Sequence, residues 1–149
     1  MISTHSAIVE KMNILLVDDR PENLFTLESI LEKPNRNFLH ATSGGEALIM
    51  AKMEQFGLIL LDYQMPDMNG LNVALKLRSD PRTAAIPIIF VSAVSRSERK
   101  MFNGFDEGTV DVLFKPIDMD DARLKVLLYE QIYFLKKQVN AMQHEYMKY

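Results

Sequence analysis

The stretch Leu58-Ile59-Leu60-Leu61-Asp62 decides the fold, because four consecutive apolar residues run directly into a carboxylate. A short apolar run without polar alternation is typical of a strand that is buried on both faces of a sheet. Three further runs of this form also end on polar residues: residues 14–17 before Asp18-Asp19, residues 88–91 before Ser92, and residues 112–114 before Lys115-Pro116. If these runs are parallel neighbours, their polar ends meet at one edge of the sheet, where ligands bind in open parallel sheets.

Helix-like segments separate these strands, and this alternation predicts a doubly wound α/β fold with five strands and five helices, the last of them extended. A short strand over residues 38–42 is less apolar and is expected near an edge of the sheet. The first predicted helix follows Pro21, and the second covers residues 44–53, where Ser43 and Glu46 are spaced as a capping box. The third follows Gly70, and its inward residues are expected to be Leu71, Ala74, Leu75 and Leu77. The fourth covers residues 97–105, and the fifth starts near Met119.

Length and composition restrict the class of protein. The chain has 149 residues, a net charge of −3 and no cysteine, so disulfides and thiolate metal sites are excluded. No run approaches the roughly 18 apolar residues of a membrane span, and residues 1–10 lack the apolar stretch of a secretion signal. We therefore expect one domain in the cytoplasm, with no membrane contact and no direct binding of nucleic acid.

The last predicted helix continues beyond the point where a compact domain would end. Apolar residues recur along it at alternating spacings of four and three, and these are Leu128, Ile132, Leu135, Val139, Met142, Tyr146 and Tyr149. This heptad pattern predicts a coiled coil and a homodimer through the helix. The alternative is an amphipathic helix packed on its own domain, although twenty residues of helix reach about 30 Å. We divide the chain into a tail (1–11), a domain (12–130) and a helical extension (131–149).

The polar strand ends have the composition of a magnesium-dependent phosphoryl site. Asp18, Asp19 and Asp62 provide the oxygen ligands that Mg²⁺ prefers, and a backbone carbonyl after Asp62 can add another. A divalent cation and the Lys115 ammonium would relieve the repulsion among three clustered acids. Lys115 and the Ser92 hydroxyl can then contact phosphoryl oxygens. No member of this set is diagnostic alone, but the four strand ends together are hard to obtain by chance.

This combination resembles the receiver domain of two-component response regulators over about residues 12–130. The resemblance is carried by Leu16-Val17-Asp18-Asp19, by residues 60–70 (Leu-Leu-Asp-Tyr-Gln-Met-Pro-Asp-Met-Asn-Gly), by Val91-Ser92-Ala93 and by Phe114-Lys115-Pro116. It implies a flavodoxin-like sheet with strand order 2-1-3-4-5. It also implies that the protein is a regulatory phosphoacceptor and not an enzyme, and that its partner is a sensor histidine kinase or a phosphotransfer protein.

The resemblance implies a role for each site residue. Asp62 is the expected phosphoacceptor, and Mg²⁺ is expected on Asp18, Asp19, Asp62 and the Gln64 backbone carbonyl, with Asp18 holding metal-bound water. Ser92 corresponds to the switch hydroxyl and Lys115 to the phosphoryl contact, with a cis Lys115–Pro116 bond. The family usually has an aromatic residue three positions before the lysine, where this chain has Val112. We therefore expect the signal to travel through the loop after Ser92.

Two other functions remain open from the sequence. One is a scaffold in which the terminal helix pairs chains independently of phosphorylation. The other is a phosphatase or phosphotransferase with an aspartyl nucleophile. Enzymes of that kind usually need a second acid two residues after the nucleophile, to protonate the leaving group, and this chain has Gln64 there.

Overall fold

The computed structural model describes residues 10–93 and 110–147, and its centre is a parallel five-stranded sheet. The strands lie in the order β2-β1-β3-β4-β5, which confirms the predicted fold class and strand order. Their bounds are β1 Met12–Val17, β2 Arg36–Ala41, β3 Leu58–Asp62, β4 Ile88–Ser92 and β5 Val110–Phe114. β2 is an edge strand as predicted, but it begins two residues earlier than expected.

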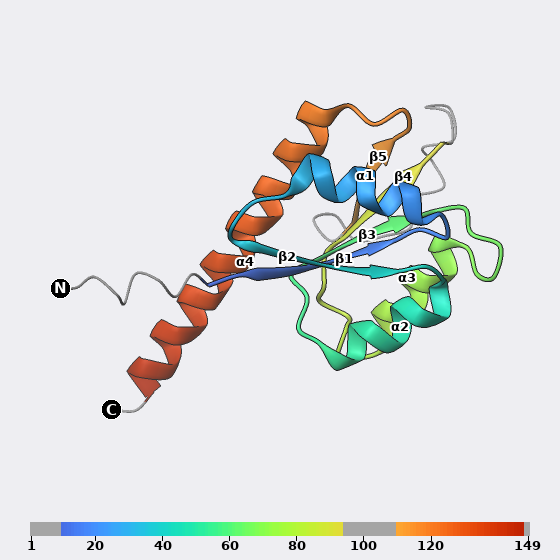
Figure 1. Cartoon of the computed structure of the whole chain (residues 1–149). Coiled ribbons are helices and arrows are strands. Elements are labelled where there is room, and N and C mark those ends of the chain that lie inside the picture. Colours follow the sequence, from blue (N-terminus) through green and yellow to red (C-terminus); the bar gives the residue numbers. More distant parts are fainter. Residues whose placement is uncertain (1–9, 94–109, 148–149) are drawn as a thin grey trace.

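Helices cover both faces of the sheet (Figure 1). One buried cluster joins α2 (Gly44–Met53) and α3 (Gly70–Ser79) to one face, and the other joins α1 (Pro21–Leu31) and α4 (Met119–Met147) to the opposite face. Every residue of β3 and β4 is buried, which explains why these strands are continuous apolar runs. The described residues contain four helices; the predicted helix over 97–105 lies outside them, so the count of five is not confirmed.

Local sequence patterns correctly predicted where α1 and α2 begin. Pro21 occupies the first turn of α1, and the Ser43 hydroxyl caps α2 by accepting from the Glu46 N–H at 3.1 Å. The capping box is a variant, because the Glu46 carboxylate accepts from the N–H of Thr42. The prediction that Leu75 faces inward in α3 is wrong: its side chain is exposed, and the buried side chains are those of Val73, Ala74 and Leu77.

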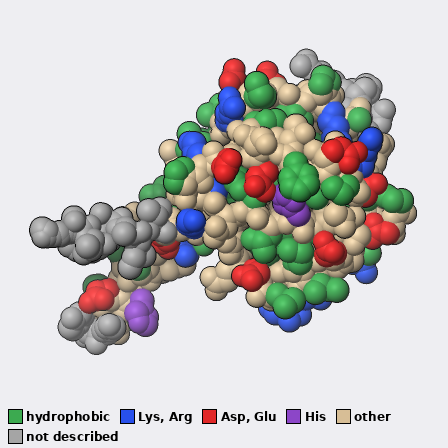
Figure 2. All heavy atoms as spheres, in the orientation of Figure 1, with side chains coloured by type: hydrophobic (Ala, Val, Ile, Leu, Met, Phe, Trp, Pro, Cys, Tyr) green, Lys and Arg blue, Asp and Glu red, His purple; other side chains and the backbone are tan. Residues whose placement is uncertain are grey.

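The last helix, α4, starts at Met119 as predicted and runs without interruption to Met147. Its first part packs on the sheet through Ala122, Val126 and Tyr129. All described side chains from residue 135 onward are exposed, and Figure 2 shows this part of the helix projecting from the rest of the molecule. The alternative of a helix packed along its whole length on its own domain is therefore wrong.

A buried ion pair fixes α4 near the point where it leaves the body. Arg36, the first residue of β2, donates from Nε to Glu130 Oε2 at 2.7 Å and from Nη2 to Oε1 at 3.3 Å. Its Nη1 also donates to the Leu31 carbonyl at the end of α1. Only 1% of the Arg36 side chain and 6% of the Glu130 side chain are exposed. This pair joins the edge strand, α1 and α4 at one place.

Candidate functional site

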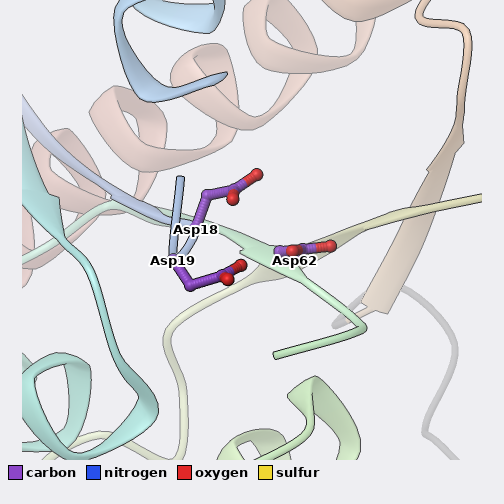
Figure 3. Close-up of side chains that lie close together, drawn as sticks. All are labelled: Asp18, Asp19 and Asp62. Carbon is purple, nitrogen blue, oxygen red and sulfur yellow. The ribbon is translucent and has the colours of Figure 1, made fainter. Parts of the chain in front are cut away.

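Three carboxylates meet at the carboxyl ends of β1 and β3 (Figure 3). Asp18 and Asp19 directly follow β1, and Asp62 is the last residue of β3. One oxygen of each carboxylate lies within 4.8 Å of the others. The parallel pairing of β1 with β3 explains this, because Val17 lies opposite Leu61 and the chains therefore end at the same level. The sequence prediction that these acids converge is confirmed.

The Asp18 carboxylate is held in place by the start of α1. Its Oδ1 accepts from the backbone N–H of Arg20 at 2.9 Å, and its Oδ2 accepts from the Asn23 side-chain amide at 3.1 Å. Sequence reasoning missed Asn23. Its only signal is its place in the first turn of a helix that begins three residues after Asp18. These bonds leave Asp18 aimed at the cluster.

Lys115 brings a positive charge to the same place from the end of β5. Its Nζ lies 3.8 Å from Asp62 Oδ1 and 3.9 Å from Asp18 Oδ2. The peptide bond between Lys115 and Pro116 is cis, as expected from the resemblance. The Lys115 backbone N–H also donates to the Ser92 carbonyl at 2.8 Å, which joins the ends of β4 and β5.

Ser92 and Gln64 lie at the same edge of the sheet. Ser92 is the fully buried last residue of β4, and it lies opposite Phe114 in the register of β4 with β5. The backbone N–H of Gln64 donates to Asp62 Oδ1 at 3.4 Å. Val112, in the position of the family's aromatic residue, is partly buried against the core. Most of the loop after Ser92, through which we expect the signal to travel, lies outside the described residues.

The loop after Asp62 folds back on the end of β3, and this requires a glycine at position 70. The Gly70 N–H donates to the Tyr63 carbonyl at 2.7 Å. A Cβ at this position would lie 2.6 Å from the Asp62 carbonyl oxygen and 2.8 Å from the Tyr63 Cα. Both atoms belong to the backbone and cannot turn aside as a side chain could. Gly70 therefore keeps this loop close to the acid cluster.

The charge of the cluster favours a divalent cation. Burial and the neighbouring Asp18 raise the pKa of Asp62 from 3.8 to about 6, although Lys115 and the Gln64 N–H act in the opposite direction. One ammonium thus only partly offsets three carboxylates. Mg²⁺ prefers oxygen ligands of this kind and usually keeps several waters. The donor set fits such an ion, and a cation there would lower the pKa of Asp62.

A pocket adjoins the cluster on the α1 side of the sheet. Its volume is about 290 Å³, and Asp18 and Lys115 form part of its wall. Most of the remaining wall is apolar and comes from α1 and the segment after β5, including Leu27, Ile30 and Ile117. The carboxylates therefore lie beside an apolar surface that sequence reasoning did not identify, because its residues come from distant parts of the chain.

Comparison with known proteins agrees with this site. The family model described as "Response regulator receiver domain" matches residues 14–127. Protein PilH of Pseudomonas aeruginosa is 35% identical over 114 residues, which cover 76% of this chain and 93% of PilH. The response regulator PleD of Caulobacter vibrioides is 40% identical over 106 residues, which cover 70% of this chain and 23% of PleD. The chain therefore spans nearly all of PilH but about a quarter of PleD.

Solved structures show the same fold. The receiver domain of the Francisella response regulator 1452 has a TM-score of 0.70 and 26% identity, covering 82% of this chain and 99% of that one. The receiver domain of the sensor histidine kinase PA1611 from Pseudomonas aeruginosa has a TM-score of 0.67 and 25% identity, covering 80% and 96%. That structure has a magnesium ion in its active-site cleft. None of the helices in the described part of our chain is long and apolar enough to cross a membrane. The acid cluster, the sheet order and these matches together show that the chain belongs to the receiver domain family of two-component response regulators.

Proposed function

We propose that Asp62 accepts a phosphoryl group from a phosphohistidine of a sensor histidine kinase or a phosphotransfer protein. The observation that supports this most is the position of Asp62 between Asp18, Asp19 and the Lys115 ammonium at the carboxyl edge of the sheet. In the transfer, the phosphorus–nitrogen bond of the phosphohistidine breaks, a phosphorus–oxygen bond to an Asp62 carboxylate oxygen forms, and the imidazole is the leaving group.

The other site residues serve positioning and charge neutralisation, which are the main needs of phosphoryl transfer. Asp18, Asp19, Asp62 and the Gln64 backbone carbonyl would hold Mg²⁺, which would supply positive charge to the phosphoryl oxygens. Lys115 pairs with one phosphoryl oxygen, and the Ser92 hydroxyl donates a hydrogen bond to another. The protein then acts as a switch and not as an enzyme with a diffusing substrate.

The pocket beside the cluster supports a protein donor. An apolar wall from α1 and residues 116–117 stands next to Asp18 and Lys115, so a donor that contacts this wall can bring a histidine to Asp62. The substitution Ile117→Arg should therefore slow transfer from a phosphorylated protein donor. It should leave transfer from a small acyl phosphate unchanged, because a small donor does not need the wall.

Phosphorylation should control the output through the pairing of two copies by α4. The apolar side chains of the helix beyond residue 134 are exposed in the described part of the chain. We place the boundary between the phosphoaccepting domain and this extension at residues 130 and 131, next to the Arg36–Glu130 pair. A phosphoryl group shifts the monomer–dimer equilibrium only if it contacts one state better than the other, and the loop after Ser92 is the segment we propose for this contact.

Intact-mass measurement tests the phosphoacceptor. With Mg²⁺ and a small acyl-phosphate donor, the wild-type mass should rise by one phosphoryl group, and removal of Mg²⁺ by a chelator should prevent the rise. Asp62→Asn should prevent it as well. Asp67→Asn is the matched control, because Asp67 lies in the same loop but outside the acid cluster. A mass gain that persists in Asp62→Asn would refute the proposal.

A further inference from the structure

The outer face of α4 carries one continuous apolar stripe, made of Leu128, Ile132, Leu135, Val139, Met142 and Tyr146. The exposed fractions of these side chains range from 41% for Ile132 to 81% for Tyr146. Their spacings alternate between four and three residues, so they form one side of the helix. Exposed apolar surface that is contiguous over five helical turns marks an interaction site.

The stripe points away from the face of α4 that packs on the body. At 100° per residue, the mean direction of the stripe differs from that of Ala122, Val126, Tyr129 and Tyr133 by roughly 130°. These four residues belong to, or pack against, the core cluster beneath α4. A helix of another molecule can therefore cover the stripe without displacing the body. The Arg36–Glu130 pair stays intact in such a complex, because Glu130 faces the body.

The residue types in the stripe identify the partner. In a heptad numbering of the helix, position a is occupied by Ile132, Val139 and Tyr146, and position d by Leu128, Leu135 and Met142. β-branched residues at a with leucine at d favour a parallel two-stranded coiled coil. In a symmetric dimer the same surface of both copies forms the interface, so a second copy of this chain is sufficient to cover the stripe.

The body sets the point where such a coil begins. The preceding position a is Lys125, whose Nζ donates to the Val112 carbonyl at 2.7 Å and lies 3.3 Å from Asp111 Oδ1. This ammonium is fixed on β5 of its own chain and is not available to a partner helix. The coil therefore starts at Leu128 and extends to Tyr146, a length of about 27 Å.

We infer that the stripe pairs two copies of this chain as a parallel coiled coil in register, with Leu128 of one copy level with Leu128 of the other. The inference rests on the dimer in the proposed function and deepens it by fixing the partner and the orientation. The two bodies lie on the outer sides of the coil, and Met147 of one copy lies beside Met147 of the other. Any segment that follows each chain is thereby held next to its counterpart.

Disulfide trapping tests the orientation, because the chain has no cysteine of its own. In a parallel coil in register, two Met142→Cys chains face each other at position d and should oxidise to a linked dimer. His144→Cys is the matched control, since position 144 lies on the side of the helix away from the stripe and should link much less. In an antiparallel coil with full overlap, position 142 instead faces position 132. A mixture of Ile132→Cys and Met142→Cys chains should then give the mixed disulfide.

The results separate the inference from the proposed phosphotransfer. Efficient linking of Met142→Cys with weak linking of His144→Cys supports the inference. Equal linking of both variants, a predominant 132–142 mixed disulfide, or no linking of any variant would overturn it. The mass gain at Asp62 is measured on the same samples, so a chain that accepts phosphoryl but does not link disproves only the coil.

A second measurement does not depend on oxidation. Light scattering should give a dimer mass for the wild type and a monomer mass for Leu135→Glu, which places a charge in the stripe. Asn140→Glu adds the same charge on the opposite side of the same exposed segment and should remain a dimer. A wild type that is monomeric at high concentration, or a Leu135→Glu variant that stays dimeric, would contradict the inference.

Discussion

In the described part of the chain, the carboxyl edge of the sheet and the outer half of α4 are both unfavourable surfaces, but for opposite reasons. The edge concentrates three carboxylates, two of them on buried residues, with one partly exposed ammonium, so an added positive charge would reduce the repulsion there. The outer half of α4 presents apolar side chains to water, so contact with an apolar surface would stabilise it. At the sheet edge the unfavourable free energy is electrostatic, because charges are buried there. On α4 it is hydrophobic, because apolar side chains are exposed there. From this comparison we expect a cation to affect one end of the molecule and the concentration of the chain to affect the other.

The largest effect is expected at the junction of these two regions. Arg36→Met leaves the Glu130 carboxylate buried without its partner, and it should lower the free energy of unfolding by about 3–5 kcal/mol. Urea denaturation at pH 7.5 measures this loss.

The matched control is Arg82→Met. The Arg82 guanidinium also makes two bonds to one carboxylate, that of Asp80, but its side chain is largely exposed. Arg82→Met should lower the free energy of unfolding much less than Arg36→Met does, because exposed ion pairs contribute little to stability. Equal losses in the two variants would show that the junction does not depend on burial.

A smaller effect is expected from the electrostatic deficit at the sheet edge. Asp62, with a pKa near 6 in the folded protein and 3.8 as its ordinary value, destabilises the metal-free fold at neutral pH. Asp62→Asn should therefore raise the free energy of unfolding at pH 7.5 by up to about 3 kcal/mol in the presence of a chelator.

The sign of this effect fixes its pH window. Because the folded state binds the proton more tightly than the unfolded chain, wild-type stability from this group rises as the pH falls from about 6 towards 4. The advantage of Asp62→Asn should shrink over the same window and vanish below it. Urea titrations at a series of pH values measure this, and a pH-independent difference would mean that the charge of Asp62 is not its cause.

The smallest effect should follow removal of residues 136–149. The described side chains in this segment are exposed, so the free energy of unfolding at low protein concentration should change by less than about 0.5 kcal/mol. The stability of the full chain should instead rise with protein concentration, and that of the shortened chain should not. Thermal denaturation over a range of concentrations measures both. A large loss at low concentration would show that the segment packs on its own body.

The sequence predicted best what depends on neighbouring residues. The strand ends at Asp18, Asp62, Ser92 and Lys115 follow from short apolar runs, and the helix starts at Pro21 and Ser43 follow from local capping. The same locality explains the error at Leu75, since an apolar residue on a short amphipathic helix does not by itself reveal which face is inward. Leu75 is exposed although it directly follows the buried Ala74.

Features that depend on distant pairing could not be predicted. Arg36 and Glu130 are 94 residues apart, and nothing near either residue indicates the other. The pocket beside the acid cluster joins α1 to residues 115–117 in the same way. The convergence of the three acids was predictable only because parallel strands impose a common edge, which converts three local patterns into one place.

The unbroken course of α4 has a mechanical consequence. The helix starts four residues after Lys115. It continues about 27 Å beyond Tyr129, the last aromatic residue of the helix that is buried. A rigid rod of that length converts a tilt of about 5° at its base into a displacement of roughly 2 Å at its tip. A rearrangement too small to disturb the core near Lys115 would thus move Met147 far enough to change the contacts that the tip of α4 makes with a neighbouring molecule.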